Sequence, residues 1–265
     1  MTDRRITPEP ALVQMNETGR ICAPIVDLLR SIEGPRDRQL LFGDEVNVLN
    51  RTDDHALVRA AKDGYCGWVA SSTIAAPRPA SHRVSALATH AYAGPDFKST
   101  DQVLLSFGSK IKALSQAGRF IETEIGFVPE QHLTPSDELA TDPAEVAALF
   151  LGTPYLWGGN GCSGIDCSGL IQAACLACGL PCPGDSDLQE RILGMVLDEA
   201  TPIRRNDLIF WKGHVALVTD ATMLIHANAN DMAVAYEPIE QAITRIIAQG
   251  DGAPTSRKRL PAVDA

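Results

Sequence analysis

The sequence predicts an α+β protein in which small β modules precede a domain with one buried helix and an antiparallel sheet. In the first half of the 265-residue chain, short β-like runs occur twice in the same order. In the second half, a glycine-rich loop leads into one apolar stretch with helical spacing, and several β-like runs follow it. Helices and strands that occupy separate stretches of a chain are typical of the α+β class.

The β modules are predicted from an internal repeat. The run LLFGDEVNVL from Leu40 matches LSFGSKIKAL from Leu105, and GWVASSTI from Gly67 matches GFVPEQHL from Gly126. Within each copy, runs of four to eight residues are separated by turn residues, as in short hairpins. A repeat of this size indicates two copies of one small β module. The resulting division is an N-terminal arm at 1–19, a first module at 20–77 and a second module at 78–135.

A second domain is predicted at 142–265, after a polar linker at 136–141. Asp142 and Pro143 have the residue types of a helix N-cap and a first helical position. A short helix is therefore expected to open this domain and to end at Leu151.

Cys167 is the candidate nucleophile of this domain. It follows a loop rich in glycine and precedes the run SGLIQAACLAC, whose apolar residues have helical spacing. Gly179 and Pro181 favour the end of a helix just after this run. Cys167 is therefore expected in the first turn of a buried helix. Unpaired N–H groups at that point favour a thiolate and can bind the oxyanion of an acyl-transfer intermediate.

His214 and His226 are the candidate base and orienting group, since a nucleophilic cysteine needs both. His214 begins one predicted strand and His226 ends the next, so pairing of these strands would bring both rings near the helix start. A cysteine on a helix followed by a histidine on an antiparallel sheet is the papain-like order. The predicted elements after the helix are strands at 207–211, 214–219, 223–227 and 233–236, a helix at 239–249 and an irregular C-terminus.

The motifs PYLWGG, GIDCSGLIQ, GHVAL and IHA together resemble the NlpC-type papain-like peptidases of bacterial cell-wall metabolism. The resemblance covers roughly half of the chain, from about Asp142 to the C-terminus. It implies that Cys167 is the nucleophile, His214 the base and His226 the orienting residue. It also implies that the hydroxyl of Tyr155 belongs to the oxyanion site. The pattern FGDEVNVL followed by GWV is similar to bacterial SH3-like domains, so both modules are expected to be small SH3-like β-barrels.

The resemblance further implies a substrate class. The family cleaves γ-D-glutamyl-diamino acid amide bonds in peptidoglycan peptides. Its recycling branch binds the free amine of an N-terminal L-Ala with an acid and two serines, and the matching residues are Asp166, Ser168 and Ser186. A carboxylate beside a thiolate is unfavourable by itself, and a substrate ammonium would relieve this repulsion. Gly184 is a departure, because many members carry arginine at this position, and it puts the contacts to substrate carboxylates in doubt.

Composition limits the partners and the compartment. A formal net charge of −10 with no basic stripe argues against a nucleic-acid partner. The N-terminal residues have no apolar core of a signal peptide, and no segment approaches the length of a membrane span. We therefore expect a cytoplasmic protein with reduced thiols and no membrane association. With the resemblance, this predicts a cysteine endopeptidase that acts on free muropeptides such as L-Ala-γ-D-Glu-diaminopimelate in murein recycling.

Two alternative functions remain open. The same motifs would serve an exported hydrolase of intact peptidoglycan, and the SH3-like repeats would also suit a non-catalytic peptide-binding module. No metal and no cofactor are predicted, because no second pair of ligands lies at zinc-finger spacing from the other cysteines of the catalytic domain. These cysteines are Cys162, Cys175, Cys178 and Cys182. The sequence gives no indication of an oligomeric state.

Overall fold

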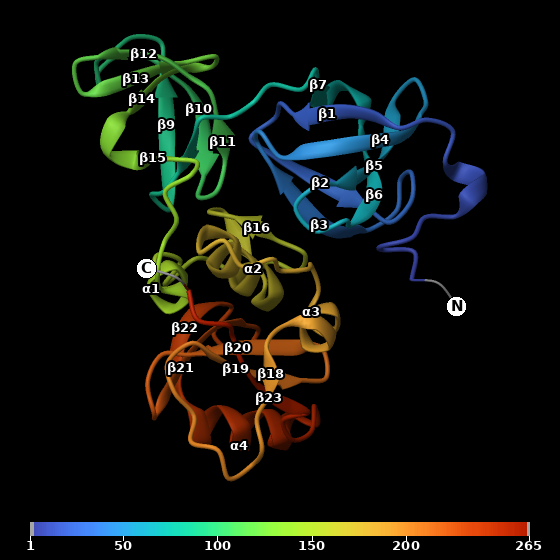
Figure 1. The fold of residues 1–265 in the computed structure, drawn as a ribbon, viewed down its shortest axis with the longest axis vertical. Helices are drawn as coiled ribbons and strands as arrows, with labels where there is room; N and C mark the ends of the chain where they lie inside the picture. Colours follow the sequence, from blue (N-terminus) through green and yellow to red (C-terminus); the bar gives the residue numbers. More distant parts are fainter. Residues whose placement is uncertain (1–2, 264–265) are drawn as a thin grey trace. The chain divides into compact units, whose positions relative to one another are not determined.

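The computed structural model describes residues 3–263 (Figure 1). The first two residues of the expected arm and the last two of the expected papain-like domain therefore lie outside the described residues. The chain divides into two compact units, Met1–Glu138 and Leu139–Ala265. The first unit is built from strands. The second contains four α-helices within the described range, which are α1 (Pro143–Ala148), α2 (Cys167–Ala177), α3 (Ser186–Ile192) and α4 (Ile239–Gln249).

A seven-stranded antiparallel sheet forms the first part of the N-terminal unit. Leu49, Leu57 and Trp68 belong to a buried cluster on this sheet. Leu12, from the short 3₁₀ turn Pro10–Leu12, packs against the same cluster, so this part of the expected arm is attached to the sheet. In spatial order the strands are β3 (Arg36–Leu41), β2 (Ile25–Leu29), β6 (Cys66–Ala70), β5 (His55–Ala60), β4 (Glu45–Arg51), β1 (Glu17–Ile21) and β7 (Ile74–Ala75).

The second part of this unit repeats the plan with two smaller sheets. Gly43 and Gly108 occupy equivalent turns of the repeat and have φ angles of 79° and 82°, a conformation that favours glycine. Phe42, from the first part, is buried with Val84 and Leu105 of the second, so the two parts share apolar contacts. One sheet contains β10 (Asp101–Ser106), β9 (Ala88–Tyr92), β14 (Gly126–Pro129), β13 (Phe120–Thr123) and β12 (Ala113–Ala117); the other contains β11 (Lys110–Ile111), β8 (His82–Val84) and β15 (Leu133–Pro135).

The C-terminal unit is built on a six-stranded antiparallel sheet. Helix α2 packs against β20 and β21, and α4 covers the sheet on the other side (Figure 1). Ile239, Ala242 and Ile246 of α4 are buried against Ile209 and Leu224 of the sheet. The spatial order is β18 (Met195–Val196), β23 (Ser256–Arg259), β19 (Asp207–Trp211), β20 (His214–Val218), β21 (Met223–Asn228) and β22 (Ala233–Pro238). A two-residue hairpin of β16 (Asn160–Gly161) and β17 (Gly164–Ile165) precedes α2.

Two predictions for this unit are wrong. The C-terminal stretch is not irregular, because it contains β23 in the interior of the sheet, between β18 and β19. The charged side chains of β23 have partners: Arg259 donates two hydrogen bonds to Asp207, and Lys258 bonds to the carbonyl oxygen of Glu190. Helix α1 ends at Ala148 instead of Leu151, because the next three N–H groups bond to carbonyls three residues back and tighten the turn.

Candidate active site

Cys167 is the first residue of α2 and is only 6% exposed. Asp166, the N-cap of this helix, accepts hydrogen bonds through Oδ1 from the N–H of Gly169 (2.6 Å) and the hydroxyl of Ser168 (2.8 Å). Its Oδ2 accepts a hydrogen bond from the N–H of Gly158 at 2.9 Å. One carboxylate thus fastens the glycine-rich loop to the first turn of the helix. The helix start at Cys167 agrees with the sequence prediction, whereas the capping role of Asp166 was missed.

Two glycines allow the loop to approach the helix. Gly158 has a φ of 70°, in the left-handed region that favours glycine. Gly169 lies so close to the loop that a β-carbon there would be 2.4 Å from the carbonyl oxygen of Gly159. The N–H of Asp166 donates to this same carbonyl at 3.2 Å. The helix start is therefore positioned mainly by main-chain contacts.

Tyr155 lies next to the start of α2. It forms an isolated parallel bridge with Ile165, and its N–H donates to the carbonyl oxygen of Met232 at 2.8 Å. Burial raises the pKa of Tyr155, and the nearby Cys167 and Asp166 raise it further. The phenol therefore remains protonated, beside Cys167, as a hydrogen-bond donor. This placement is compatible with the predicted oxyanion role.

His214 and His226 are brought together by neighbouring strands. Nε2 of His214 lies 2.9 Å from Nδ1 of His226, and the ring centroids are 5.1 Å apart. His214 is the first residue of β20, whereas His226 lies two residues before the end of β21 and is fully buried. Burial lowers the pKa of His214, and the neighbouring His226 lowers it further. His214 is therefore a neutral imidazole that can accept a proton.

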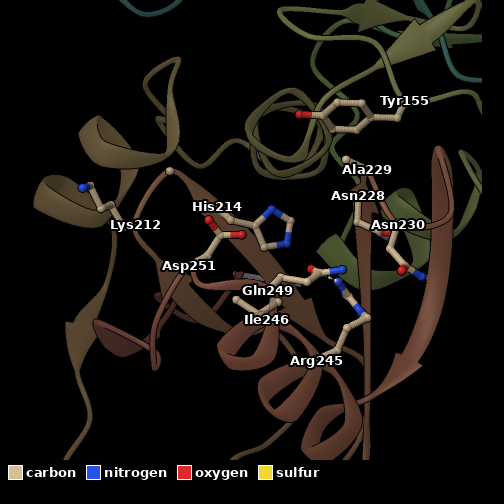
Figure 2. Close-up of a pocket in the computed structure, with 11 residues that line it drawn as sticks. Tyr155, Lys212, His214, Asn228, Ala229, Asn230, Arg245, Ile246, Gln249 and Asp251 are labelled. Atoms are coloured by element: carbon tan, nitrogen blue, oxygen red, sulfur yellow. Dashed lines mark hydrogen bonds between the residues drawn. The ribbon is translucent and has the colours of Figure 1, made fainter.

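A cavity of about 200 Å³ opens beside His214 (Figure 2). Tyr155 and His214 both line it, and Tyr155 is also the neighbour of Cys167. The cavity thus connects the helix side of the site with the histidine side. Its other lining residues come from the β19–β20 turn, the end of β21 and the end of α4: Lys212, Gly213, Asn228, Ala229, Asn230, Arg245, Ile246, Gln249 and Asp251.

The remaining predicted substrate residues are Ser168 and Ser186. Ser168 is the second residue of α2 and is buried with its hydroxyl on Asp166. Ser186 is the first residue of α3 and is also buried. Gln189, which sequence reasoning missed, ties α3 to α2 because its Nε2 donates to the carbonyl oxygen of Ser168 at 2.8 Å. Among the described residues, no hydrogen bond joins Ser186 to Asp166, so their joint role in binding an ammonium stays a prediction.

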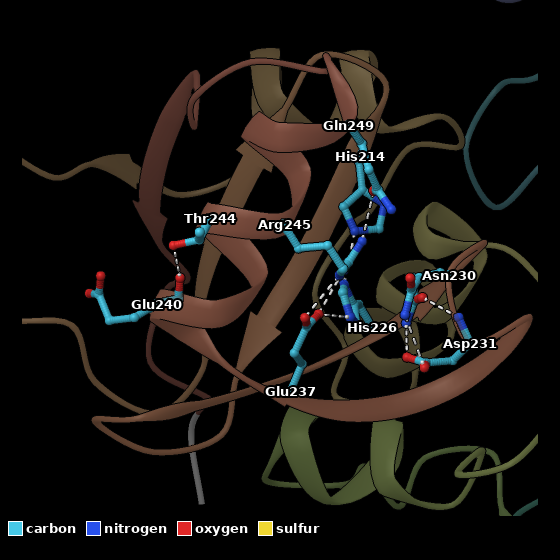
Figure 3. Close-up of polar contacts among 10 residues, drawn as sticks. His214, His226, Asn230, Asp231, Glu237, Glu240, Thr244, Arg245 and Gln249 are labelled. Carbon is cyan, nitrogen blue, oxygen red and sulfur yellow. Dashed lines mark hydrogen bonds and ion pairs between the residues drawn. The ribbon is translucent and has the colours of Figure 1, made fainter.

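Glu237 and Arg245 are the other polar residues that the sequence did not reveal. Oε2 of Glu237 lies 3.1 Å from Nε2 of His226. Arg245 donates to both oxygens of this carboxylate, at 2.9 Å and 2.7 Å (Figure 3). Neither residue belongs to a recognisable motif. Only the pairing of β21 with β22, together with the packing of α4 on the sheet, brings them to His226.

No group of three or more His, Cys, Asp and Glu side chains suited to a metal ion occurs within residues 3–263. Over the same range, every helix is too short or too polar to cross a membrane.

A cysteine at a helix N-terminus and two hydrogen-bonded histidines on the following antiparallel sheet define a papain-like site. Family models agree with this class: the model of the NlpC/P60 family matches residues 152–246, and that of the bacterial dipeptidyl-peptidase Sh3 domain matches residues 28–74. The papain-like domain of this chain belongs to the NlpC/P60 family, and SH3-like β sheets precede it.

Curated relatives include dipeptidyl-peptidase 6 of Lysinibacillus sphaericus, 35% identical over 115 residues, which are 40% of this chain and 41% of that protein. The match therefore spans about two fifths of that relative. The gamma-D-glutamyl-L-lysine dipeptidyl-peptidase of Bacillus subtilis (strain 168) is 27% identical over 216 residues, 71% of each chain.

Solved structures show the same fold. An NlpC/P60 family protein from Bacillus cereus ATCC 10987 superposes with a TM-score of 0.77 over 92% of this chain and all of that one, at 20% identity. An NlpC/P60 endopeptidase from Photobacterium damselae subsp. piscicida has a TM-score of 0.59 at 16% identity, over 92% of this chain and 71% of that one. At these identities the likeness concerns the fold alone.

Proposed function

We propose that this protein is a cysteine peptidase that hydrolyses γ-D-glutamyl-diamino acid amide bonds in peptides derived from peptidoglycan. One arrangement carries this proposal. Cys167 begins a buried helix beside Tyr155, and His214, which is hydrogen-bonded to His226, lines the same cavity as Tyr155. The name of the Bacillus subtilis relative, which specifies a γ-D-glutamyl-L-lysine bond, supports the type of bond that is cleaved.

In the proposed reaction, His214 takes the proton of the Cys167 thiol, and the thiolate attacks the carbonyl carbon of the γ-D-glutamyl amide. The N–H of Cys167 and the hydroxyl of Tyr155 donate hydrogen bonds to the oxyanion. Protonated His214 then gives its proton to the leaving amine as the C–N bond breaks. Water, deprotonated by His214, attacks the thioester, which releases the acid and restores the thiol.

We further propose that the substrate is a free muropeptide, L-Ala-γ-D-Glu-diaminopimelate, and that the protein serves cytoplasmic murein recycling. A dipeptidyl-peptidase releases two residues from an amino terminus, so its substrate carries an ammonium group two residues before the cleaved bond. Asp166 and Ser168 flank Cys167 at the start of α2, which supports their role in binding this ammonium. Ser186 is the third proposed contact.

The test is a comparison of three substrates: the free tripeptide L-Ala-γ-D-Glu-meso-diaminopimelate, its N-acetyl derivative and intact sacculi. We expect release of L-Ala-γ-D-Glu from the free tripeptide, measured by mass spectrometry. The kcat/KM for the acetylated peptide should be about 100-fold lower, because its amide leaves polar groups of the site unpaired. A Cys167→Ala variant serves as the control.

Each other outcome has a defined meaning. Equal cleavage of all three substrates would contradict the recycling substrate and leave the peptidase in place. Cleavage of sacculi alone would indicate a wall hydrolase. If no γ-D-glutamyl bond is cleaved and iodoacetamide alkylates Cys167 no faster than the other cysteines, the peptidase itself is wrong and a peptide-binding module is favoured.

A further inference from the structure

Four side chains form a continuous polar chain that leads from the cavity into the sheet (Figure 3). His214 contacts His226 at 2.9 Å, His226 contacts Glu237 at 3.1 Å, and Glu237 accepts two hydrogen bonds from Arg245. The four residues come from four different elements, β20, β21, β22 and α4. The chain is largely screened from water, since His226 is fully buried and the Glu237 side chain is 15% exposed.

The bond between the two histidines can have either of two directions. A neutral imidazole carries one proton, on one of its two nitrogens. If Nδ1–H of His226 donates to Nε2 of His214, then Nδ1 of His214 is protonated and cannot accept the proton of a thiol. If Nε2–H of His214 donates instead, Nδ1 of His214 is free to act as the base. The direction of this one hydrogen bond therefore decides whether His214 works.

Glu237 selects the second direction. An ionised carboxylate only accepts hydrogen bonds, so the approach of Glu237 Oε2 to within 3.1 Å of Nε2 favours the proton of His226 on this nitrogen. Nδ1 of neutral His226 is then unprotonated and accepts from Nε2–H of His214. Arg245 keeps the carboxylate ionised: the hydrogen bonds from Arg245, and next the one from His226, lower the pKa of Glu237 to about 2.

We propose that Glu237, held by Arg245, is a positioning residue that fixes the tautomers of both histidines and so presents the unprotonated Nδ1 of His214 to the substrate side of the site. The proposal rests on the peptidase function proposed above. A histidine as orienting group requires such a partner, because it is both donor and acceptor. An orienting side chain that can only accept hydrogen bonds, such as a carboxylate, would by itself require His214 to be the donor.

The other charged groups near this chain do not replace Glu237. Asp231, in the turn between β21 and β22, acts on Arg245, whose pKa is raised first by Glu237 and also by Asp231. Lys212 and Asp251 also line the cavity, but they do not belong to the paired strands β21 and β22, which carry His226 and Glu237. In the described structure, Glu237 is the acidic side chain that faces Nε2 of His226.

The first test is Glu237→Gln, with Glu240→Gln as matched control. Glu240 is an exposed residue of α4 whose backbone carbonyl accepts from Thr244. A glutamine amide can donate or accept, so both directions of the histidine bond return in Glu237→Gln. We expect kcat to fall about 100-fold with little change in KM. This fall is smaller than the one expected if every molecule had the inverted tautomer. Glu240→Gln should match the wild type.

The second test measures the tautomers directly by long-range ¹H–¹⁵N correlation spectra of the imidazoles, at neutral pH, in Cys167→Ala protein. With Glu237 present, we expect protons on Nε2 of both histidines. Adding Glu237→Gln should give a mixture. This measurement needs no turnover, so it still tests the inference if the peptidase function fails.

Arg245→Lys is a second variant that retains Glu237 and is useful if Glu237→Gln does not fold. It should keep the Nε2–H tautomers and lose less than about 10-fold in kcat, because a single ammonium still pairs with the carboxylate. The inference is overturned if His214 carries its proton on Nδ1 in the presence of Glu237. Unchanged tautomers and kcat in folded Glu237→Gln would overturn it as well.

Discussion

The two sides of the candidate site are positioned by different kinds of contact. On the helix side, Cys167 is placed by local contacts within a short segment, in which main-chain N–H groups of Gly158 and Gly169 bond to the Asp166 carboxylate and the loop backbone lies against Gly169. On the sheet side, His214 is placed by a chain of three side chains, which come from three other elements. Substitutions that crowd the backbone should therefore disturb the helix side, whereas substitutions that change the protonation of side chains should disturb the sheet side.

The largest expected effect is that of Cys167→Ala, which removes the nucleophile and leaves the positioning contacts of both sides in place. We expect kcat on the free tripeptide to fall by at least about 10⁴-fold, while the midpoint of thermal unfolding stays close to that of the wild type. Product release followed by mass spectrometry measures this. Cys162→Ala, at a half-buried cysteine of the preceding loop, is the control and should retain activity. A Cys167→Ala protein with substantial turnover would contradict the assignment.

Gly169→Ala tests the backbone of the helix side. An alanine inside a helix normally stabilises it by about 1 kcal/mol relative to glycine. Here the new β-carbon would meet the carbonyl oxygen of Gly159 at 2.4 Å, so we expect the free energy of unfolding to fall by about 2–3 kcal/mol. Urea denaturation measures the change. Gly94→Ala is the control, because its β-carbon would meet nothing nearer than 3.9 Å. A Gly169→Ala protein as stable as the wild type would show that the loop moves aside freely.

Asp166→Ala should have a smaller effect on the same side. It removes the acceptor of three hydrogen bonds, so we expect a loss of about 2 kcal/mol in unfolding free energy, at the upper end for N-caps. Asp142→Ala removes the N-cap of α1, one main-chain hydrogen bond and a partly exposed ion pair with Arg205, and should cost about 1 kcal/mol. Both are measured by urea denaturation. Equal losses would mean that Asp166 acts as a simple cap and does not fasten the loop.

The helix side could be predicted from the sequence because its determinants are local. The glycine-rich loop, the apolar spacing after Cys167 and the position of Gly179 all lie within one segment, and the structure places α2 within one residue of the prediction. Strand β19 and helix α4 begin and end as predicted, because each has a strong local pattern.

The rest depends on contacts between distant segments. The residues of strand β23 are polar and charged, which is unusual for a strand in the interior of a sheet. Their charges are paired there, because Arg259 donates to Asp207 and Lys258 bonds to the carbonyl oxygen of Glu190. Glu237 and Arg245 likewise have no local signal. Their function arises from strand register and helix packing, which a single sequence does not reveal.

The smallest expected effect concerns acid stability on the sheet side. The pKa of Glu237 is lowered from 4.5 to about 2 by Arg245 and then by His226. Between these values the unfolded chain binds a proton that the folded protein does not bind. The stabilisation is therefore fully present above about pH 4.5 and is lost as the pH falls toward 2. Because the group is partly solvated, we expect it to contribute no more than about 1 kcal/mol.

Urea denaturation from pH 7 to pH 3 measures this contribution. The unfolding free energy of Glu237→Gln should be lower than that of the wild type at pH 7 and should fall less steeply below pH 4.5, since the variant has no proton to gain at this position. Glu240→Gln should keep the steeper wild-type slope, because Glu240 is exposed. If Glu237→Gln has the wild-type slope, Arg245 and His226 do not perturb Glu237. Glu237 would then be ionised at neutral pH without help from Arg245, and Arg245 would have no part in fixing the tautomers of His214 and His226.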